Sequence, residues 1–296
     1  MRQIIMLDEG MRILEEGIVK AKTILIGHPP KTLFSGEDYM KFYNWVYTMC
    51  SQRPPYAYSG ELYDRYRTTL EESIVSVVLP SLNDKRNACL LVELLQMWEN
   101  YKVMTKCLSR FFLYLDQYFV RRRNIPSLGD LAILSFRDLV CNKLYGNIRD
   151  AAISLINEER NGKLFQQDLL KQVMTFFLET GGEKRDYYEA FEQIMLEDAA
   201  SYYSQLASKL LCCNSSTDYI QKVAWLLEQE RKSASQYLQQ GSLEKLLETL
   251  KWKLMGETEP LLIEKHTDES CDAAKFQDLL SKCAGMSLGE ESYVSL

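Results

Sequence analysis

Histidine and cysteine often supply nucleophiles, general bases and metal ligands in proteins, and this chain offers little of that chemistry. It has two histidines, His28 beside a proline and His266 in a polar stretch. Its eight cysteines are scattered and form no C-x-x-C pair, the spacing common in zinc sites. Most lie in apolar helical patterns, where a reduced thiol behaves as a small buried hydrophobic group. We expect no metal site, and we expect the vicinal pair Cys212–Cys213 to mark a helix end.

Paired carboxylates could act as general acids and bases, and three pairs occur: Glu71–Glu72, Glu158–Glu159 and Glu197–Asp198. Each lies in an expected helix beside basic residues, which is typical of a solvated helix face. The phosphate-binding patterns G-x-x-x-x-G-K-[ST] and G-x-G-x-x-G do not occur. We therefore expect a protein that is not an enzyme and that uses no cofactor.

Charge and hydropathy narrow the classes of partner. The net charge of the 296-residue chain is −6, which does not favour nucleic acid or an anionic membrane surface. No run of about 18 apolar residues predicts a membrane-spanning helix. The first apolar run is too short for a signal peptide and lacks a small-residue cleavage site. These features predict an intracellular protein.

Proline and helical periodicity predict an all-α fold. Prolines punctuate the chain as far as Pro126, and the next is Pro260. Apolar residues repeat at helical spacing between these breaks, and no alternating strand pattern with a hairpin turn is present. Ser35 is the expected N-cap of the second helix, with Asp38 three positions later. The other expected helices cover about 8–26, 59–80, 83–101, 104–122, 128–145, 147–161, 165–180, 184–212 and 217–240, with a further one from Ser242.

The helices group into blocks of similar size. "LEES" at 70–73 returns as "LEDA" at 196–199, which with the matching helix numbers indicates a long repeat and hence a helical solenoid. We predict repeats at 1–125 and 126–240, and an incomplete third repeat with a polar tail at 241–296.

Aromatic residues are the chain's real excess, with 18 tyrosines. On a helix, the large apolar groups of 37–50 cover an arc of roughly 220°, although one buried face needs about 100°. The predicted helix 104–122 also has a wide apolar face. Two such helices in one block indicate an exposed patch that binds a partner. The basic run Arg121–Arg123 is typical of the C-terminal end of a helix, where positive charges interact favourably with the helix dipole. The alternative is that these residues form a basic patch that binds an acidic partner.

Several long segments resemble the N-terminal part of the cullin of SCF ubiquitin ligases, over about residues 5–255. They include "DYMKFYNWVYTMCSQRPP", "LYDRYRTTLEESIVSVVLPSL", "WENYKVMTKCLSRFFLYLDQYFVRRRNIPSL", "SFRDLV", "INEERNGKLFQQDLLKQV" and "MLEDAASYYSQLASKLL". The resemblance implies an elongated α-solenoid of five-helix cullin repeats. It also implies a scaffold that holds substrate receptors, in the cytoplasm and nucleus.

In this family a Skp-type adapter, which carries F-box proteins, docks on the second and fifth helices of the first repeat. The resemblance therefore implies a protein-binding site made of Tyr39, Met40, Tyr43, Val46, Tyr47, Phe111, Phe112, Tyr114, Leu115, Asp116 and Phe119. Phe42, Trp45 and Met49 are then expected on the intramolecular side of the second helix.

The C-terminal cullin domain that grips the RING-box protein has no counterpart in the resemblance. We therefore expect no RING-box binding, whether the chain is a piece of a longer protein or a short cullin-like protein that competes for adapters. The alternative function is a helical tether with other partners, or a cullin relic that no longer binds an adapter.

Overall fold

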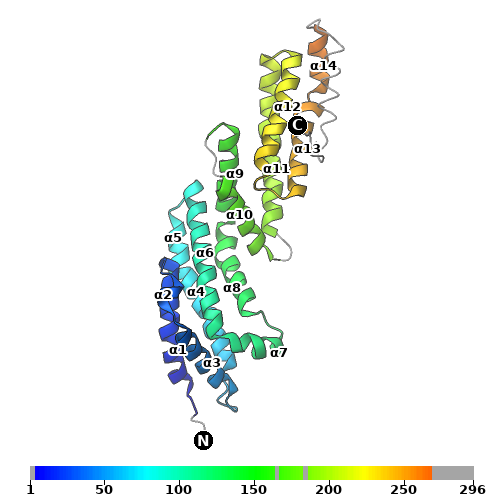
Figure 1. The fold of residues 1–296 in the computed structure, drawn as a ribbon. Helices are drawn as coiled ribbons and strands as arrows, with labels where there is room; N and C mark the ends of the chain where they lie inside the picture. Colours follow the sequence, from blue (N-terminus) through cyan, green and yellow to red (C-terminus); the bar gives the residue numbers. More distant parts are fainter. Residues whose placement is uncertain (1–3, 164–166, 183–185, 269–296) are drawn as a thin grey trace, which may run out of the picture. The chain divides into compact units, whose positions relative to one another are not determined.

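The computed structural model describes residues 4–163, 167–182 and 186–268, and every regular element in these ranges is a helix (Figure 1). The predicted all-α class is confirmed. None of the helices in the described ranges is both long and apolar enough to cross a membrane. The chain divides into two compact units. The first contains Met1–Arg160 and Phe176–Lys184, and the second contains Asn161–Thr175 and Arg185–Leu296. The predicted repeat boundaries stay a prediction, because a compact unit and a sequence repeat are different properties.

The first unit begins with α1 (Leu7–Lys22), the 3₁₀ segment η1 (Thr23–Ile26), the short α2 (Pro30–Leu33) and α3 (Gly36–Ser51). Gly27 ends the first helical run with a φ of 95°, a value that glycine adopts without strain. α1 packs along α3, and both pack against α6 (Asn87–Phe111).

A proline lies inside the next helical run instead of ending it. α4 (Ser59–Ser73) continues through the π-helical segment η2 (Ile74–Val78) into α5 (Leu79–Asn83), so the expected end at Pro80 is wrong. Proline has no N–H to donate to the carbonyl four residues earlier and its ring crowds that turn. The wider π turn just before Pro80 is where the helix absorbs this defect.

α6 corrects a second prediction. The sequence suggested separate helices at 83–101 and 104–122, but α6 runs from Asn87 to Phe111 without a break. The segment "NYKVMT" contains no glycine or proline, so nothing local stops the helix there. The interruption comes at Phe112, whose φ of −94° and ψ of 11° leave the α region. The π segment η3 (Leu115–Val120) and α7 (Arg121–Arg123) follow.

Arg121–Arg123 does close a helix, because Asn124 adopts the left-handed conformation directly after it. The chain then forms α8 (Leu128–Phe136), the π segment η4 (Arg137–Cys141) and α9 (Asn142–Arg160). Helical structure thus passes through Gly146, where a break was predicted. A single interior glycine costs only about 1 kcal/mol, which packing of α9 along α6 can offset.

The second unit contains α11 (Asp186–Cys213), α12 (Ser216–Ala234), α13 (Gln240–Lys251), the π segment η6 (Trp252–Gly256) and α14 (Glu259–Asp268). α10 (Gln167–Thr180) contributes residues to both units. α13 packs on α11 and α12, and α14 packs on α12. The predicted helix 217–240 ends earlier than expected, at Ala234.

The cysteines only partly follow the expectation of burial. Cys50, Cys107 and Cys141 are buried, whereas Cys89, Cys212 and Cys213 are exposed, and all six are free thiols. Cys213 is the last residue of α11, as predicted for the vicinal pair. Cys271 and Cys283 lie outside the described residues.

Candidate functional site

The start of α3 is fixed by local hydrogen bonds. The backbone N–H of Ser35 donates to the Asp38 carboxylate at 2.8 Å, and the N–H of Asp38 donates to the Ser35 hydroxyl at 3.1 Å. This is the capping box that the sequence predicted. The hydrogen bonds from Ser35 hold the pKa of Asp38 below its usual range. The register of every aromatic residue on α3 follows from this start.

Glycines on α1 let α3 approach closely. A Cβ atom on Gly17 would lie 2.8 Å from Cζ of Phe42, and one on Gly10 would lie 2.2 Å from Sδ of Met49. Phe42 and Met49 are therefore buried against α1, as expected for the intramolecular side. Trp45, the third residue expected there, is only half-buried.

An aromatic cluster joins α3 to the end of α6. The ring of Phe111 lies 4.6 Å from that of Phe42 and 5.7 Å from that of Tyr39 between centroids. The Tyr39 hydroxyl is 3.3 Å from Sγ of Cys107, to which it donates, and the Arg110 guanidinium lies over the Tyr39 ring at 5.1 Å. Burial, with the hydrogen bond to Cys107, raises the pKa of Tyr39 to about 12. Tyr39 is thus half-buried, uncharged at neutral pH and held from several sides.

A row of tyrosines crosses from α3 to η3. Tyr43 stacks on Tyr47 at 6.5 Å between ring centroids, Tyr47 meets Tyr114 edge-on at 5.3 Å, and Tyr114 lies 4.6 Å from Tyr118. Met40 is one helical turn before Tyr43 and is 58% exposed. We call Met40, Tyr43, Tyr47, Tyr114 and Tyr118 the tyrosine surface. Burial raises the pKa of Tyr114, and its neighbours Cys50, Tyr47 and Tyr118 act in the same direction.

Four residues of the predicted docking site have no exposed surface. These are Val46, Phe111, Phe112 and Leu115, each at 0% exposure. The prediction that these four side chains contact a partner directly is therefore wrong, because they are fully buried in the core. These four side chains instead support the exposed residues of α3 and η3 from inside the core.

Two further residues of the predicted docking site, Asp116 and Phe119, make contacts within the chain. The Asp116 carboxylate accepts a hydrogen bond of 2.8 Å from the backbone N–H of Leu128, so it fixes the start of α8. The half-buried Phe119 lies 6.0 Å from Tyr63 and beneath the Arg123 guanidinium. Of the predicted set, the exposed or half-exposed members are Tyr39, Met40, Tyr43, Tyr47, Tyr114, Asp116 and Phe119.

Tyr118, Leu113 and Arg110 lie beside residues of the predicted docking site but were not included in it. Tyr118 and Leu113 are 48% and 42% exposed, and Arg110 covers Tyr39. The docking residues of 104–122 were taken from the family resemblance, which did not include these three, and the single helix expected over 104–122 is interrupted at Phe112. The four-residue spacing of Tyr114 and Tyr118 would have identified the pair once the break was known.

The tyrosine surface has the chemistry of a protein-docking site. Exposed tyrosines combine a large apolar ring with a polar tip, and they lose little conformational entropy on binding. Within the described residues, no cluster of histidine, cysteine or acidic side chains has a metal-binding arrangement. The arrangement therefore suits contact with another protein surface.

Comparison with known proteins identifies relatives of the chain. A family model described as "Cullin alpha solenoid domain" matches residues 19–287, which confirms the predicted helical-solenoid class. The chain is 43% identical to "Cullin-1" of Oryza sativa subsp. japonica over 89% of its own length and 36% of the relative's. It is 38% identical to "Putative cullin-like protein 2" of Arabidopsis thaliana over 84% of its length and 66% of the relative's. It is 33% identical to "Cullin-like protein 3" of the same plant over 79% of its length and 91% of the relative's.

The chain thus spans little more than a third of rice cullin-1, and about two thirds of one shorter relative. The tyrosine surface lies inside the region that the family model matches.

Proposed function

Because the chain belongs to the cullin family, we propose that it is a non-catalytic scaffold subunit of an SCF-type cullin–RING E3 ubiquitin ligase. It binds a Skp-type adapter through the tyrosine surface, and F-box proteins join through the adapter. The complex acts in the cytoplasm and the nucleus.

The observation that carries this proposal is the tyrosine row that joins α3 to η3. These are the two segments to which the family resemblance assigns adapter docking. Consecutive ring centroids along the row are 4.6–6.5 Å apart, so a partner meets a group of neighbouring aromatic rings instead of isolated side chains. Aromatic residues and methionine are enriched at protein interfaces, and such anchors carry most of the binding energy.

The buried members of the predicted site support the surface from below. Phe111 packs against Phe42 on the inner side of α3 and against Tyr39 at its edge. Leu115 is fully buried and lies next to Tyr114 in the chain. Side chains that a close-packed core already holds in place lose little conformational entropy when a partner binds, which favours affinity.

The test is the affinity of the purified chain for a purified Skp-type adapter, measured by isothermal titration calorimetry. We expect the double variant Met40→Ala/Tyr47→Ala to bind at least about 30-fold more weakly, the effect of losing roughly 2 kcal/mol at an interface hot spot. Tyr39 is left unchanged, because its packing and its bond to Cys107 would confuse binding with stability.

The control is Val92→Ala, which removes an apolar side chain that is 52% exposed on α6. This variant should bind as the wild type does, and all three proteins should have the same circular dichroism spectrum. Equal binding by the double variant, or no binding by the wild type, would refute the proposal.

A further inference from the structure

The arginine run of α7 has no carboxylate partner. Arg121, Arg122 and Arg123 are all exposed, and none of them forms an ion pair with another residue of the described ranges. By contrast, Arg65 of α4 is paired with Glu15. The dipole of a helix amounts to only about half a negative charge at its C-terminal end, so closing a helix does not compensate three arginines. The charge of this run is therefore available to a partner.

Two guanidinium groups lie beside the tyrosine surface. That of Arg110 lies over the ring of Tyr39, one helical turn before Tyr43, at 5.1 Å from the ring centroid. Burial raises the pKa of Tyr114, and the positive charge of Arg122 acts in the opposite direction, so this charge is within electrostatic reach of the Tyr114 hydroxyl. No carboxylate in the described part of the chain forms an ion pair with either arginine. Positive charge therefore borders the surface on both α6 and α7.

The hydroxyl groups of the tyrosine surface are also available. In the same unit, the buried Tyr63 and Tyr101 donate to the backbone carbonyls of Pro126 and Ala132, at 2.8 and 3.0 Å. The four tyrosines of the surface form no such hydrogen bond with any residue that the structure describes. Each of their hydroxyls can therefore donate a hydrogen bond to an acceptor on a partner.

We propose that the face of the adapter that covers the tyrosine surface is acidic. Carboxylates of the adapter pair with Arg110 and Arg122, and acceptor oxygens between them take hydrogen bonds from the tyrosine hydroxyls. A carboxylate suits both kinds of donor, because the planar guanidinium group can bind it through two hydrogen bonds and a hydroxyl can donate to it. This inference rests on the proposed function, since it describes the partner of the same surface.

The charge of the rest of the chain gives these arginines a role in the approach of the adapter. The chain carries a net charge of −6, so as a whole it repels an acidic partner. Positive charge beside the docking residues gives that partner one favoured region of approach. Charges at the rim of an interface act chiefly on the association rate and on its dependence on salt. The association rate is therefore the quantity to measure.

The test uses stopped-flow fluorescence with the full chain and a purified, dye-labelled Skp-type adapter, at 20 mM and 1 M NaCl. We expect the wild-type association rate to fall at least about tenfold between these concentrations. Arg110→Gln and Arg122→Gln should each associate about threefold more slowly than the wild type at 20 mM NaCl. All three proteins should associate at similar rates at 1 M NaCl, where the Debye length is only about 3 Å.

The matched control is Lys85→Gln, which removes the same charge from an exposed lysine that forms no ion pair in the described ranges. Lys85 precedes α6 and Arg110 lies in its last turn, so roughly 35 Å of helix separates them. This distance exceeds the Debye length at 20 mM NaCl, which is about 20 Å. Lys85→Gln should therefore associate as fast as the wild type.

A second pair of substitutions tests the hydroxyl groups. Tyr47→Phe/Tyr118→Phe keeps both rings and removes only their hydroxyls. We expect this variant to dissociate from the adapter at least about threefold faster than the wild type, because it loses hydrogen bonds to acceptors of the adapter. Dissociation is measured by mixing the labelled complex with excess unlabelled adapter.

The outcomes separate this inference from the proposed function. An association rate that does not change with salt would overturn the acidic face, as would wild-type association by both arginine variants at 20 mM NaCl. Wild-type dissociation by Tyr47→Phe/Tyr118→Phe would overturn it as well. In each case weaker binding by Met40→Ala/Tyr47→Ala would still support docking on the tyrosine surface. No binding by the wild type would refute the proposed function, and this inference with it.

Discussion

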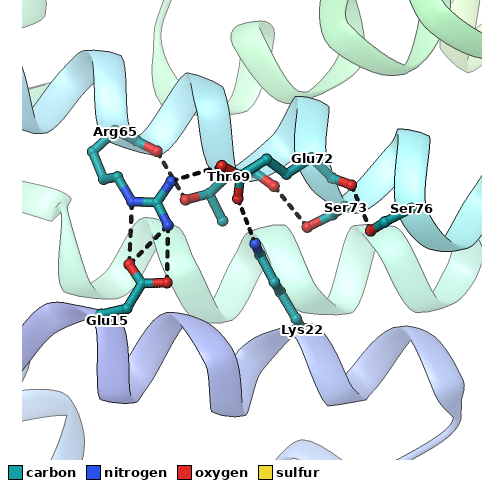
Figure 2. Close-up of polar contacts among 7 residues, drawn as sticks. All are labelled: Glu15, Lys22, Arg65, Thr69, Glu72, Ser73 and Ser76. Atoms are coloured by element: carbon teal, nitrogen blue, oxygen red, sulfur yellow. Dashed lines mark hydrogen bonds and ion pairs between the residues drawn. The ribbon is translucent and has the colours of Figure 1, made fainter.

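At the scale of single residues, an ion-pair network joins α1 to α4 (Figure 2). The Arg65 guanidinium donates to both oxygens of Glu15, at 2.9 and 2.7 Å, and also reaches Glu72 at 3.2 Å. Lys22 from α1 completes the network with a 2.7 Å bond to Glu72. The bidentate geometry orients the two helices as well as attracting them.

We expect the Glu72 contribution to stability to depend on pH. The hydrogen bond from Lys22 holds the pKa of Glu72 below its ordinary value of 4.5, and Arg65 acts in the same direction against partial burial. The folded state therefore binds this proton less readily than the unfolded state. The contribution is complete above pH 4.5 and is lost as the pH falls through the lower folded pKa.

Glu72→Gln should cost up to about 1 kcal/mol at pH 7, since the carboxylate is partly exposed. Urea unfolding at pH 7, 5 and 3 measures this, and the gap between variant and wild type should close at the lowest pH. Glu71→Gln is the control, because no described residue forms an ion pair with that carboxylate. A gap that is constant with pH would contradict the assignment.

At the scale of elements, the distance between α1 and α3 depends on residues without side chains. Helix propensity alone would disfavour Gly10 and Gly17 inside α1 by about 1 kcal/mol each. The structure offsets this cost by burying Met49 and Phe42 of α3 in the space that the glycines leave. The placement of α3, and hence of the tyrosine surface, follows from this contact.

Gly17→Ala should therefore destabilise the chain by about 1–3 kcal/mol, because the new methyl group overlaps the buried Phe42 ring. Gly146→Ala is the matched control in α9. Nothing lies within 4 Å of a Cβ atom at that position, so this change should stabilise by up to about 1 kcal/mol. Thermal or urea unfolding of both variants measures the difference. Stabilisation by both substitutions would show that α3 adjusts freely.

At the scale of the whole molecule, the tyrosine surface belongs to the first compact unit. The second unit has its own core, in which Tyr219 donates to the carbonyl of Leu254 at 2.6 Å and Tyr203 donates to Glu230 at 2.7 Å. Each unit thus has buried polar contacts that belong to it alone.

An exposed aromatic residue of the second unit should have no influence on adapter binding. Trp225 is 52% exposed on α12, with the Lys222 ammonium 4.0 Å from its ring centroid. Trp225→Ala should bind the adapter within twofold of the wild type in the same titration that tests the tyrosine surface. A tenfold loss would mean that adapter contacts extend into the second unit.

Sequence reasoning predicted much of the fold and less of the site. The all-α class and the Ser35 capping box were predicted, because hydrogen bonds and apolar spacing over a few residues determine them. The division of helices at residues 101–104 was wrong, since the local sequence has no breaker there and the interruption falls at Phe112 instead.

The sequence by itself determined that α3 and the segment after α6 have more aromatic surface than one buried face needs. Only the tertiary structure decided which of those side chains are exposed. Val46 and Tyr47 are neighbours on α3, yet Val46 is fully buried and Tyr47 is 39% exposed. The physical reason is that helical spacing depends on residues within about four positions, whereas burial depends on partners that are distant in the chain, as Gly17 and Phe111 are for Phe42.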